Sequence, residues 1–252
     1  MGVPTYYTRL LKHDALDSKL TEKMRLFISG SAPLLDETFN EFNQRTNHLI
    51  LERYGMTETN MNTSNPLKGA RKAGTVGLPL DDVEVVVVDE ENNLLPQGEI
   101  GNLQVKGPNA FKGYWGLPEK TKEDFSEDGF FNTGDKGVID EDGYISIIGR
   151  SKDMIISGGL NVYPKEIESL IDKIEGVQES AVIGLNDEDL GEKVVAIIVS
   201  SEELTLDEKE VIAEIKNQLA GFKVPKEVKF IKQLPRNAMG KVQKNILRDT
   251  FS

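Results

Sequence analysis

The 252-residue sequence predicts an α/β fold in its first part and a small α+β module at its end. Three observations support this prediction. A buried strand, a small-residue loop, a helix and a second buried strand follow one another over residues 24–51, which is an α/β order. β-branched runs separated by turn dipeptides occupy residues 83–149. Residues 151–252 alternate helical apolar stripes with apolar strands.

The first part opens with a short helix predicted over Pro4–Leu11, with proline in its first turn. The apolar run Met24–Ser29 predicts a buried strand that ends at Gly30-Ser31-Ala32-Pro33. Asp36–Thr46 predicts a helix, because its two phenylalanines lie three residues apart on one face.

A second buried strand, predicted over His48–Leu51, leads into Glu52-Arg53-Tyr54-Gly55-Met56-Thr57-Glu58-Thr59. Open α/β sheets bind ligands at the edge where strands end, and the loop at residues 30–33 would share that edge. The six residues from Tyr54 to Thr59 offer one aromatic ring, two threonine hydroxyls and one carboxylate, which suit phosphate and Mg²⁺. The alternative is a plain passage from strand to turn with solvated polar residues.

The middle of the chain predicts strands over Val83–Asp89, Glu99–Lys106 and Gly143–Gly149, which fit a small β-barrel or a second sheet. Between them, Asp128–Asp135 predicts a glycine-punctuated loop that holds the carboxylate of Asp135 between tight turns. Two ordinary hairpin turns would also explain its glycines. A domain boundary is expected near residues 149–153, where the periodicity changes.

The last hundred residues predict a compact α+β module. The residues Thr205 to Glu208 have the spacing of a capping box before a helix that extends to about Leu219. The other predicted elements are a helix over Pro164–Ile174, strands over Ser180–Leu185, Lys193–Val199 and Val228–Ile231, and a terminal helix over Lys244–Thr250.

Composition excludes several classes of protein. Without cysteine there are no disulfides, thiolate zinc sites or cysteine nucleophiles, and two distant histidines disfavour a Ser-His-Asp triad. A net charge of -12 argues against nucleic-acid binding. No apolar run is long enough to cross a bilayer, so we expect no membrane partner. We expect a cytoplasmic location, or an organelle matrix if a targeting segment is absent.

The segment Lys223–Arg248 departs from this acidic character, with eight basic residues and one acidic residue. Such an excess suits either the docking of a polyanionic small molecule or a solvated basic face.

Five stretches in order resemble the acyl-adenylate-forming (AMP-binding) superfamily, which includes acyl-CoA synthetases, luciferases and peptide-synthetase adenylation domains. They are Ser29-Gly-Ser-Ala-Pro-Leu34, Tyr54-Gly-Met-Thr-Glu-Thr59, Thr133-Gly-Asp135, Gly149-Arg-Ser-Lys-Asp153 with Ser157-Gly-Gly-Leu-Asn-Val-Tyr-Pro164, and Pro235-Arg-Asn-Ala-Met-Gly-Lys241.

Within that superfamily, three further stretches resemble the malonyl-CoA synthetases. They are Met1-Gly-Val-Pro-Thr-Tyr-Tyr-Thr-Arg-Leu-Leu11, Glu52-Arg-Tyr-Gly-Met-Thr-Glu-Thr-Asn-Met-Asn-Thr-Ser-Asn65 and Ala73-Gly-Thr-Val-Gly77.

The resemblance implies a role for each matching residue. Lys241, Thr57 and Glu58 would be catalytic, with Glu58 on Mg²⁺ and Lys152 at a hinge. Arg9 and Ser31 would hold the distal carboxylate of malonate, although Arg9 could also be an ordinary salt-bridged helix residue. Ser157, Gly158 and Gly159 would line the coenzyme A tunnel, where a plain turn is the alternative. The nucleotide would contact Ser31, Ala32, Pro33, Glu52, Arg53, Tyr54, Gly55, Met56, Thr57, Asp135 and Arg150.

The implied activity is an ATP-dependent acid–thiol ligase that forms malonyl-CoA through malonyl-AMP, with ATP, Mg²⁺ and coenzyme A. Another short-chain or dicarboxylate acyl-CoA synthetase, or a non-catalytic nucleotide-binding fragment, would fit the same motifs. Residues 1–150 are expected to be the C-terminal half of the large domain, and residues 151–252 the small mobile domain. The triphosphate loop of the family is missing from this sequence, so we expect a fragment that is inactive without an N-terminal half, which could be a second chain.

Overall fold

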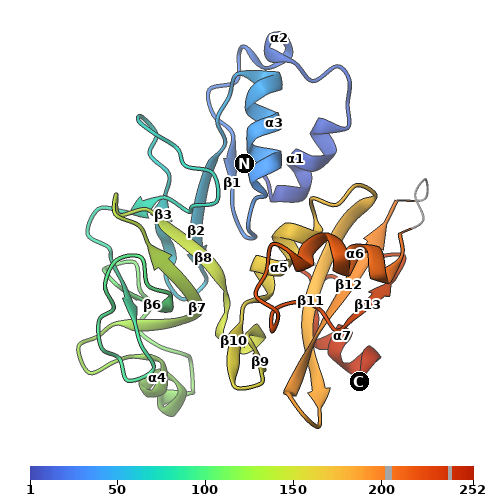
Figure 1. Cartoon of the computed structure of the whole chain (residues 1–252). Helices are drawn as coiled ribbons and strands as arrows, with labels where there is room; N and C mark the ends of the chain where they lie inside the picture. The colour runs from blue at the N-terminus through green and yellow to red at the C-terminus, as the bar shows by residue number, and fades with distance from the viewer. Residues whose placement is uncertain (202–205, 238–239) are drawn as a thin grey trace. The chain divides into compact units, whose positions relative to one another are not determined.

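The computed structural model describes residues 1–201, 206–237 and 240–252. The chain divides into two compact units, Met1–Ile147 and Ile148–Ser252 (Figure 1). Within the described residues, no helix combines the length and the apolar character needed to cross a membrane.

The first unit holds three α-helices near its start and two sheets. Its elements are α1 (Pro4–Leu11), α2 (Ser18–Thr21), β1 (Ile28–Ser29), α3 (Asp36–Thr46), β2 (Leu51–Met56), β3 (Asn60–Ser64), β4 (Leu78–Pro79), β5 (Glu84–Val88), β6 (Gly101–Lys106), α4 (Pro118–Asp124), β7 (Phe131–Ile139) and β8 (Ile145–Arg150), the last of which runs into the second unit.

One sheet of this unit has the strand order β1-β2-β3-β4, and only its β1–β2 pair is parallel. The other has the order β5-β6-β7-β8 and is the second sheet that the middle of the sequence predicted. The small β-barrel does not form, because no pairing closes β5 onto β8 in the part of the chain that the structure describes. A bridge between Gly77 and Ile145 joins the two sheets.

Two hydrophobic clusters stabilise the first unit. One gathers Tyr7 of α1, Phe39 and Phe42 of α3 and Ile50, so the predicted apolar face of α3 is buried. The Tyr7 hydroxyl donates to the Ile28 carbonyl at 2.6 Å, which fixes α1 against β1. The second cluster consists of aliphatic side chains from β5, β6 and β8 together with Val76.

Two predicted loops of the first unit are strands. The strand predicted over His48–Leu51 begins only at Leu51 and runs to Met56 as β2, so Tyr54 and Gly55 lie within a strand. The turn that follows is Thr57–Thr59. Asp135 lies within β7, which runs through the glycine-punctuated stretch. The predicted strand over residues 24–29 is reduced to the two residues of β1.

The second unit is built on one five-stranded sheet with the order β10-β9-β12-β11, and with β13 beside β12. Its elements are the 3₁₀ turn η1 (Ser151–Asp153), β9 (Ile155–Ser157), β10 (Leu160–Val162), α5 (Pro164–Ile171), β11 (Val177–Asp187), β12 (Gly191–Ser200), α6 (Glu208–Lys216), β13 (Glu227–Phe230) and α7 (Lys244–Phe251).

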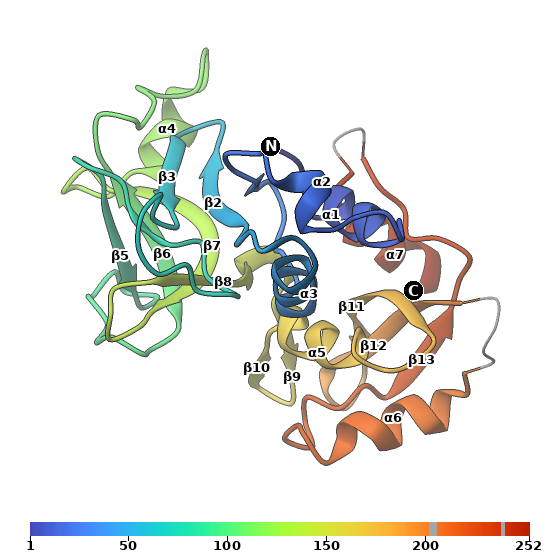
Figure 2. The same ribbon diagram turned by 90° about the horizontal axis from the view of Figure 1, so that it is seen from above.

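Both faces of this sheet are covered. α5 and α6 pack on one face through Ile167, Ile171, Val211 and Ile215, and α7 packs on the other through Leu247 (Figure 2). The cap of α6 is a capping box between Asp207 and Glu210. Thr205, where we predicted that box, lies outside the described residues.

Candidate active site

Two strands of the first unit bring an aromatic ring and a carboxylate into direct contact. Tyr54 of β2 packs against the aliphatic cluster, and its hydroxyl donates to Asp135 Oδ2 of β7 at 2.5 Å. Asp135 is 6% exposed. Its backbone N–H donates to Thr133 Oγ1 at 3.1 Å, and that hydroxyl donates to the Leu103 carbonyl at 2.8 Å. Packing therefore fixes Tyr54 on β2, and hydrogen bonds fix Asp135 on β7.

Glu52, the second residue of β2, links β2 to β1 and to the loop that follows β1. Ser29 pairs with Glu52 in the β1–β2 register, and Glu52 Oε1 accepts from the Leu34 N–H at 3.0 Å. This contact holds the Ser31-Ala32-Pro33 loop at the same edge as the Tyr54 stretch, as the α/β pattern predicted. Ser31, Ala32 and Pro33 are exposed there, with Ser31 at φ 72°.

Gly55 allows a close approach of β2 and β3. A Cβ at this position would lie 2.0 Å from the Asn60 carbonyl oxygen, so a side chain cannot fit without moving the backbone. The β2–β3 register shifts between Tyr54 and Gly55. Glycine at this position is therefore required by packing.

The turn after β2 presents Thr57 and Glu58. Thr57 is exposed, and Glu58 is half-buried, with the Tyr114 hydroxyl donating to its Oε1 at 3.3 Å. Burial first, and then the nearby carboxylates of Glu58 and Asp124, raise the pKa of Tyr114 to about 12, so this hydroxyl stays a donor at neutral pH.

Among the described residues there is no cluster of three acidic or histidine side chains that could hold a metal alone. Mg²⁺ usually takes one or two protein carboxylates together with substrate phosphates and waters. A single half-buried Glu58 with one protein hydrogen bond therefore fits an ion that arrives with a nucleotide, but not a resident protein-bound ion.

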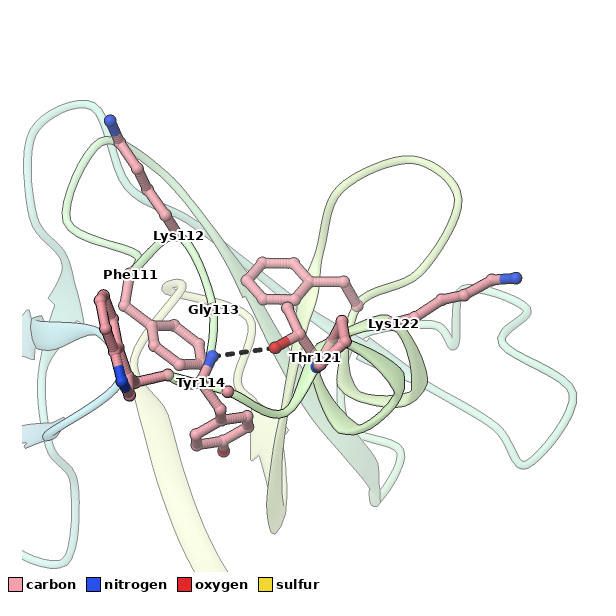
Figure 3. Close-up of a pocket in the computed structure, with 10 residues that line it drawn as sticks. Phe111, Lys112, Gly113, Tyr114, Thr121 and Lys122 are labelled. Atoms are coloured by element: carbon pink, nitrogen blue, oxygen red, sulfur yellow. Dashed lines mark hydrogen bonds between the residues drawn. The ribbon is translucent and has the colours of Figure 1, made fainter.

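Sequence reasoning missed the segment Asn109–Tyr114, which contacts this turn. The Phe111 N–H donates to the Glu58 carbonyl at 2.7 Å, and Asn109 Nδ2 donates to the Thr59 carbonyl at 2.7 Å. Phe111 and Tyr114 also line an open pocket of about 640 Å³ beside α4 (Figure 3). The available signal was the run Phe111-Lys-Gly-Tyr-Trp-Gly116, whose aromatic rings and glycines are unusual for a polar loop.

The two residues assigned to the substrate carboxylate lie on separate elements. Arg9 is exposed on α1, and Ser31 follows β1. No hydrogen bond or ion pair joins them within the described ranges 1–201, 206–237 and 240–252.

In the second unit, Lys241 ends a short loop closed by Asn237. The Lys241 N–H donates to Asn237 Oδ1 at 3.0 Å, and the Asn237 N–H donates to the Lys241 carbonyl at 3.0 Å. The ammonium of Lys241 has no ion-pair partner among the residues that the structure describes. Ala238 and Met239 of this predicted motif lie outside them.

Ser157, Gly158 and Gly159 form the β9–β10 hairpin. Gly158 and Gly159 have φ values of 58° and 77°, which a two-residue hairpin turn of this kind requires and which favour glycine. Ser157 is buried, and the Gly158 N–H donates to the Leu190 carbonyl at 2.8 Å. Lys152 lies exposed in η1, two residues after the exposed Arg150.

Most of the basic segment near the C-terminus is paired within the second unit. This pairing reduces the charge available to a polyanion. The pairs are Lys223 with Glu166, Lys229 with Glu227, Arg236 with Glu179, Lys244 with Glu168, and Arg248 with Asp153.

Two family models match the chain and together cover more than half of it. The model of the AMP-binding enzyme matches residues 1–115, and the model of the AMP-binding enzyme C-terminal domain matches residues 166–241.

Individual relatives point the same way. The chain is 44% identical to a malonate–CoA ligase of Arabidopsis thaliana over 99% of this chain and 44% of the relative. It is 37% identical to a feruloyl-CoA synthase of Amycolatopsis sp over 99% of this chain and 51% of the relative. An ATP-bound crystal structure of MatB from Rhodopseudomonas palustris superimposes with a TM-score of 0.98 at 58% identity, over 100% of this chain and 50% of that one.

The chain thus spans about half the length of the relatives it matches. Its five motifs, its two matched models and these relatives agree. The chain belongs to the AMP-binding enzyme family, and malonate–CoA ligases are among the relatives to which it is similar.

Proposed function

We propose that this chain is part of an ATP-dependent acid–thiol ligase that converts malonate, ATP and coenzyme A into malonyl-CoA, AMP and pyrophosphate. In the first half-reaction a malonate oxygen attacks the α-phosphorus of ATP, and the bond to pyrophosphate breaks. In the second, the coenzyme A sulfur attacks the acyl carbon after losing its proton, and the bond to AMP breaks.

The contact between Tyr54 and Asp135 is the observation that carries this proposal. It places a flat aromatic face beside a buried carboxylate whose Oδ2 already accepts one hydrogen bond. An aromatic face suits stacking on adenine, and a carboxylate suits two ribose hydroxyls. Similarity to an ATP-bound protein over the whole of this chain supports the same assignment.

Neither half-reaction needs a protein nucleophile, so the chain acts through position and charge. Thr57 offers an exposed hydroxyl to the α-phosphate, and Lys241 offers an ammonium that offsets the charge developing there. Glu58 would hold Mg²⁺, which when bound neutralises phosphate charge. Together with Tyr54 and Asp135, the loop of Ser31, Ala32 and Pro33 and the backbone of β2 would form the surface that faces the nucleotide, here called the nucleotide wall.

Malonate is the proposed acid because of Arg9. A guanidinium recognises a free carboxylate by two parallel hydrogen bonds, and Arg9 is exposed and without an ion-pair partner in the described part of the chain. Ser31 would add a hydroxyl. Similarity to a malonate–CoA ligase supports this choice.

The second unit is proposed to serve the two half-reactions in turn, with Lys152 as the hinge. Lys241 would act in adenylation, whereas the Ser157-Gly158-Gly159 hairpin would meet the pantetheine of coenzyme A. A hinge concentrates large backbone changes in a few residues at the end of an element, and Lys152 lies in the short turn η1 after β8.

The triphosphate-binding loop is proposed to come from a further segment, because the chain covers about half of each relative. That segment would be encoded upstream of Met1 or on a second chain. The runner-up function is ligation of another acid, which similarity to a feruloyl-CoA synthase keeps open. A nucleotide-binding fragment without catalysis is the third reading.

The test is pyrophosphate release by the protein completed with its N-terminal half, with malonate, methylmalonate, acetate, succinate and ferulate compared. We expect malonate to give the largest kcat/KM, and Arg9→Ala to lower that value for malonate while leaving acetate unchanged. A higher value for another acid would end the malonate assignment. No release with any acid would favour the non-catalytic reading.

A further inference from the structure

We infer that the segment Asn109–Tyr114, here called the strap, positions Glu58, with Tyr114 as the residue that orients its carboxylate. This inference rests on the proposed function only for the role of Glu58. The contacts themselves lie within the first unit and do not depend on that role.

Two residues of the strap donate hydrogen bonds to backbone carbonyls in and just after the Thr57–Thr59 turn. The Phe111 N–H donates to the Glu58 carbonyl at 2.7 Å. Asn109 Nδ2 donates to the carbonyls of Thr59 at 2.7 Å and Met61 at 3.1 Å. The turn therefore depends on groups about fifty residues away in the sequence.

The Tyr114 hydroxyl reaches the carboxylate itself, donating to Glu58 Oε1 at 3.3 Å. This distance is long for an O–H···O bond, so its contribution is to orient the carboxylate more than to hold it tightly. The second carboxylate oxygen has no protein partner within the described residues, which leaves it for a ligand.

Tyr114 is in turn fixed by α4. Its N–H donates to Thr121 Oγ1 at 2.8 Å, the dashed contact in Figure 3, and that hydroxyl donates to the Leu117 carbonyl at 3.0 Å. Gly113 allows this approach, because a Cβ there would lie 2.7 Å from Thr121 Cγ2. Packing and a second hydrogen bond thus set the direction of the tyrosine.

The strap also connects Glu58 to the strand that carries Asp135. The Phe111 ring contacts the rings of Tyr114 at 4.8 Å and Phe131 at 5.3 Å between centroids. Phe131 is 1% exposed and begins β7, four residues before Asp135. One aromatic cluster therefore connects the strap, which holds the Thr57–Thr59 turn, to the strand that carries Asp135.

Two substitutions test the inference in the completed protein. Tyr114→Phe keeps the ring and removes the hydroxyl, and we expect the Mg²⁺ concentration for half-maximal pyrophosphate release to rise about 10-fold, the size typical for a lost partner of a metal ligand. Asn109→Ala removes the side-chain hydrogen bonds to the Thr59 and Met61 carbonyls, and we expect amide hydrogen exchange over residues 57–61 to accelerate about 10-fold or more.

Tyr144→Phe is the matched control, since its hydroxyl donates to the Ala70 carbonyl at 2.7 Å elsewhere in the same unit. It should change neither readout. The inference is overturned if Tyr114→Phe matches the control in Mg²⁺ dependence, or if Asn109→Ala leaves exchange over residues 57–61 unchanged. If the wild-type protein released no pyrophosphate with any acid, the proposed function would fail, and the exchange measurement would still decide whether the strap holds the turn.

Discussion

The candidate site residues of the two units are held in different ways. In the first unit, side chains from distant elements bond to one another, as Tyr54 does with Asp135 and Tyr114 with Glu58. In the second unit the contacts go through backbone N–H groups instead: the Lys241 N–H donates to Asn237 Oδ1, and the Gly158 N–H donates to the Leu190 carbonyl. The Lys241 ammonium has no described ion-pair partner. The first unit therefore has its geometry set before a ligand arrives, while the second carries reactive groups on small turns.

The largest effect is expected from Asp135 in the first unit. Asp135→Ala removes the partner of Tyr54 and the proposed partner of two ribose hydroxyls. Hydrogen bonds to a charged group contribute about 1.5–3 kcal/mol each, so kcat/KM for ATP should fall by roughly 100- to 10,000-fold. Steady-state kinetics of pyrophosphate release measure this loss.

Lys241 of the second unit should affect a different kinetic constant. Lys241→Ala should lower kcat for adenylation and leave ATP affinity within about threefold, because its ammonium is proposed to act on the developing charge. If Asp135→Ala lowered only kcat, or left ATP kinetics unchanged, Asp135 would not be part of a nucleotide-binding surface that is formed before ATP binds.

A smaller effect concerns stability in the second unit. Ser180 Oγ donates to Asp172 Oδ1 at 2.6 Å at the end of α5, and burial raises the pKa of Asp172 from 3.8 to about 6. The folded state favours the protonated form of Asp172. Protonated Asp172 therefore carries no penalty for the folded state below about pH 4, and the penalty for ionising it grows as the pH rises through 6. Ionised Asp172 should then cost about 3 kcal/mol at pH 7 as an upper bound.

Asp172→Asn should therefore raise the free energy of unfolding at pH 7 by up to about 3 kcal/mol, and much less at pH 4. Urea unfolding at the two pH values measures the difference. Asp249→Asn, an exposed change in α7, is the control. An equal gain at both pH values would show that ionisation of Asp172 is not the cause.

Sequence patterns predicted the elements whose apolar faces are regular. α3 has the predicted bounds, and its buried residues include both phenylalanines. The strands β11 and β12 extend beyond the predicted ranges at both ends, but their apolar cores lie where they were expected.

Strands rich in polar residues escaped prediction. β3 buries Asn62 and Thr63, and β7 buries Thr133, Asp135 and Lys136. Hydrophobic periodicity cannot detect such strands, because their buried side chains are polar. Thr133 of β7, for example, is buried and donates its hydroxyl to the Leu103 carbonyl of the neighbouring strand β6 at 2.8 Å.

The sequence predicted only those site residues that belong to a recognisable motif. The Tyr54 stretch and Asp135 were identified, but their contact was not, because 81 residues separate them. The strap had no recognised motif, and its role depends on backbone carbonyls in the turn it contacts. Contacts of this kind follow from tertiary structure and leave little signal in one sequence.

The most direct test of the nucleotide wall is amide hydrogen exchange of the completed protein with and without ATP. We predict that ATP slows exchange over residues 51–59 and 131–139, the β2 stretch with its turn and the strand β7, and that Asp135→Ala abolishes this protection. Unchanged exchange in both segments, in a protein that still releases pyrophosphate from ATP, would contradict the assignment.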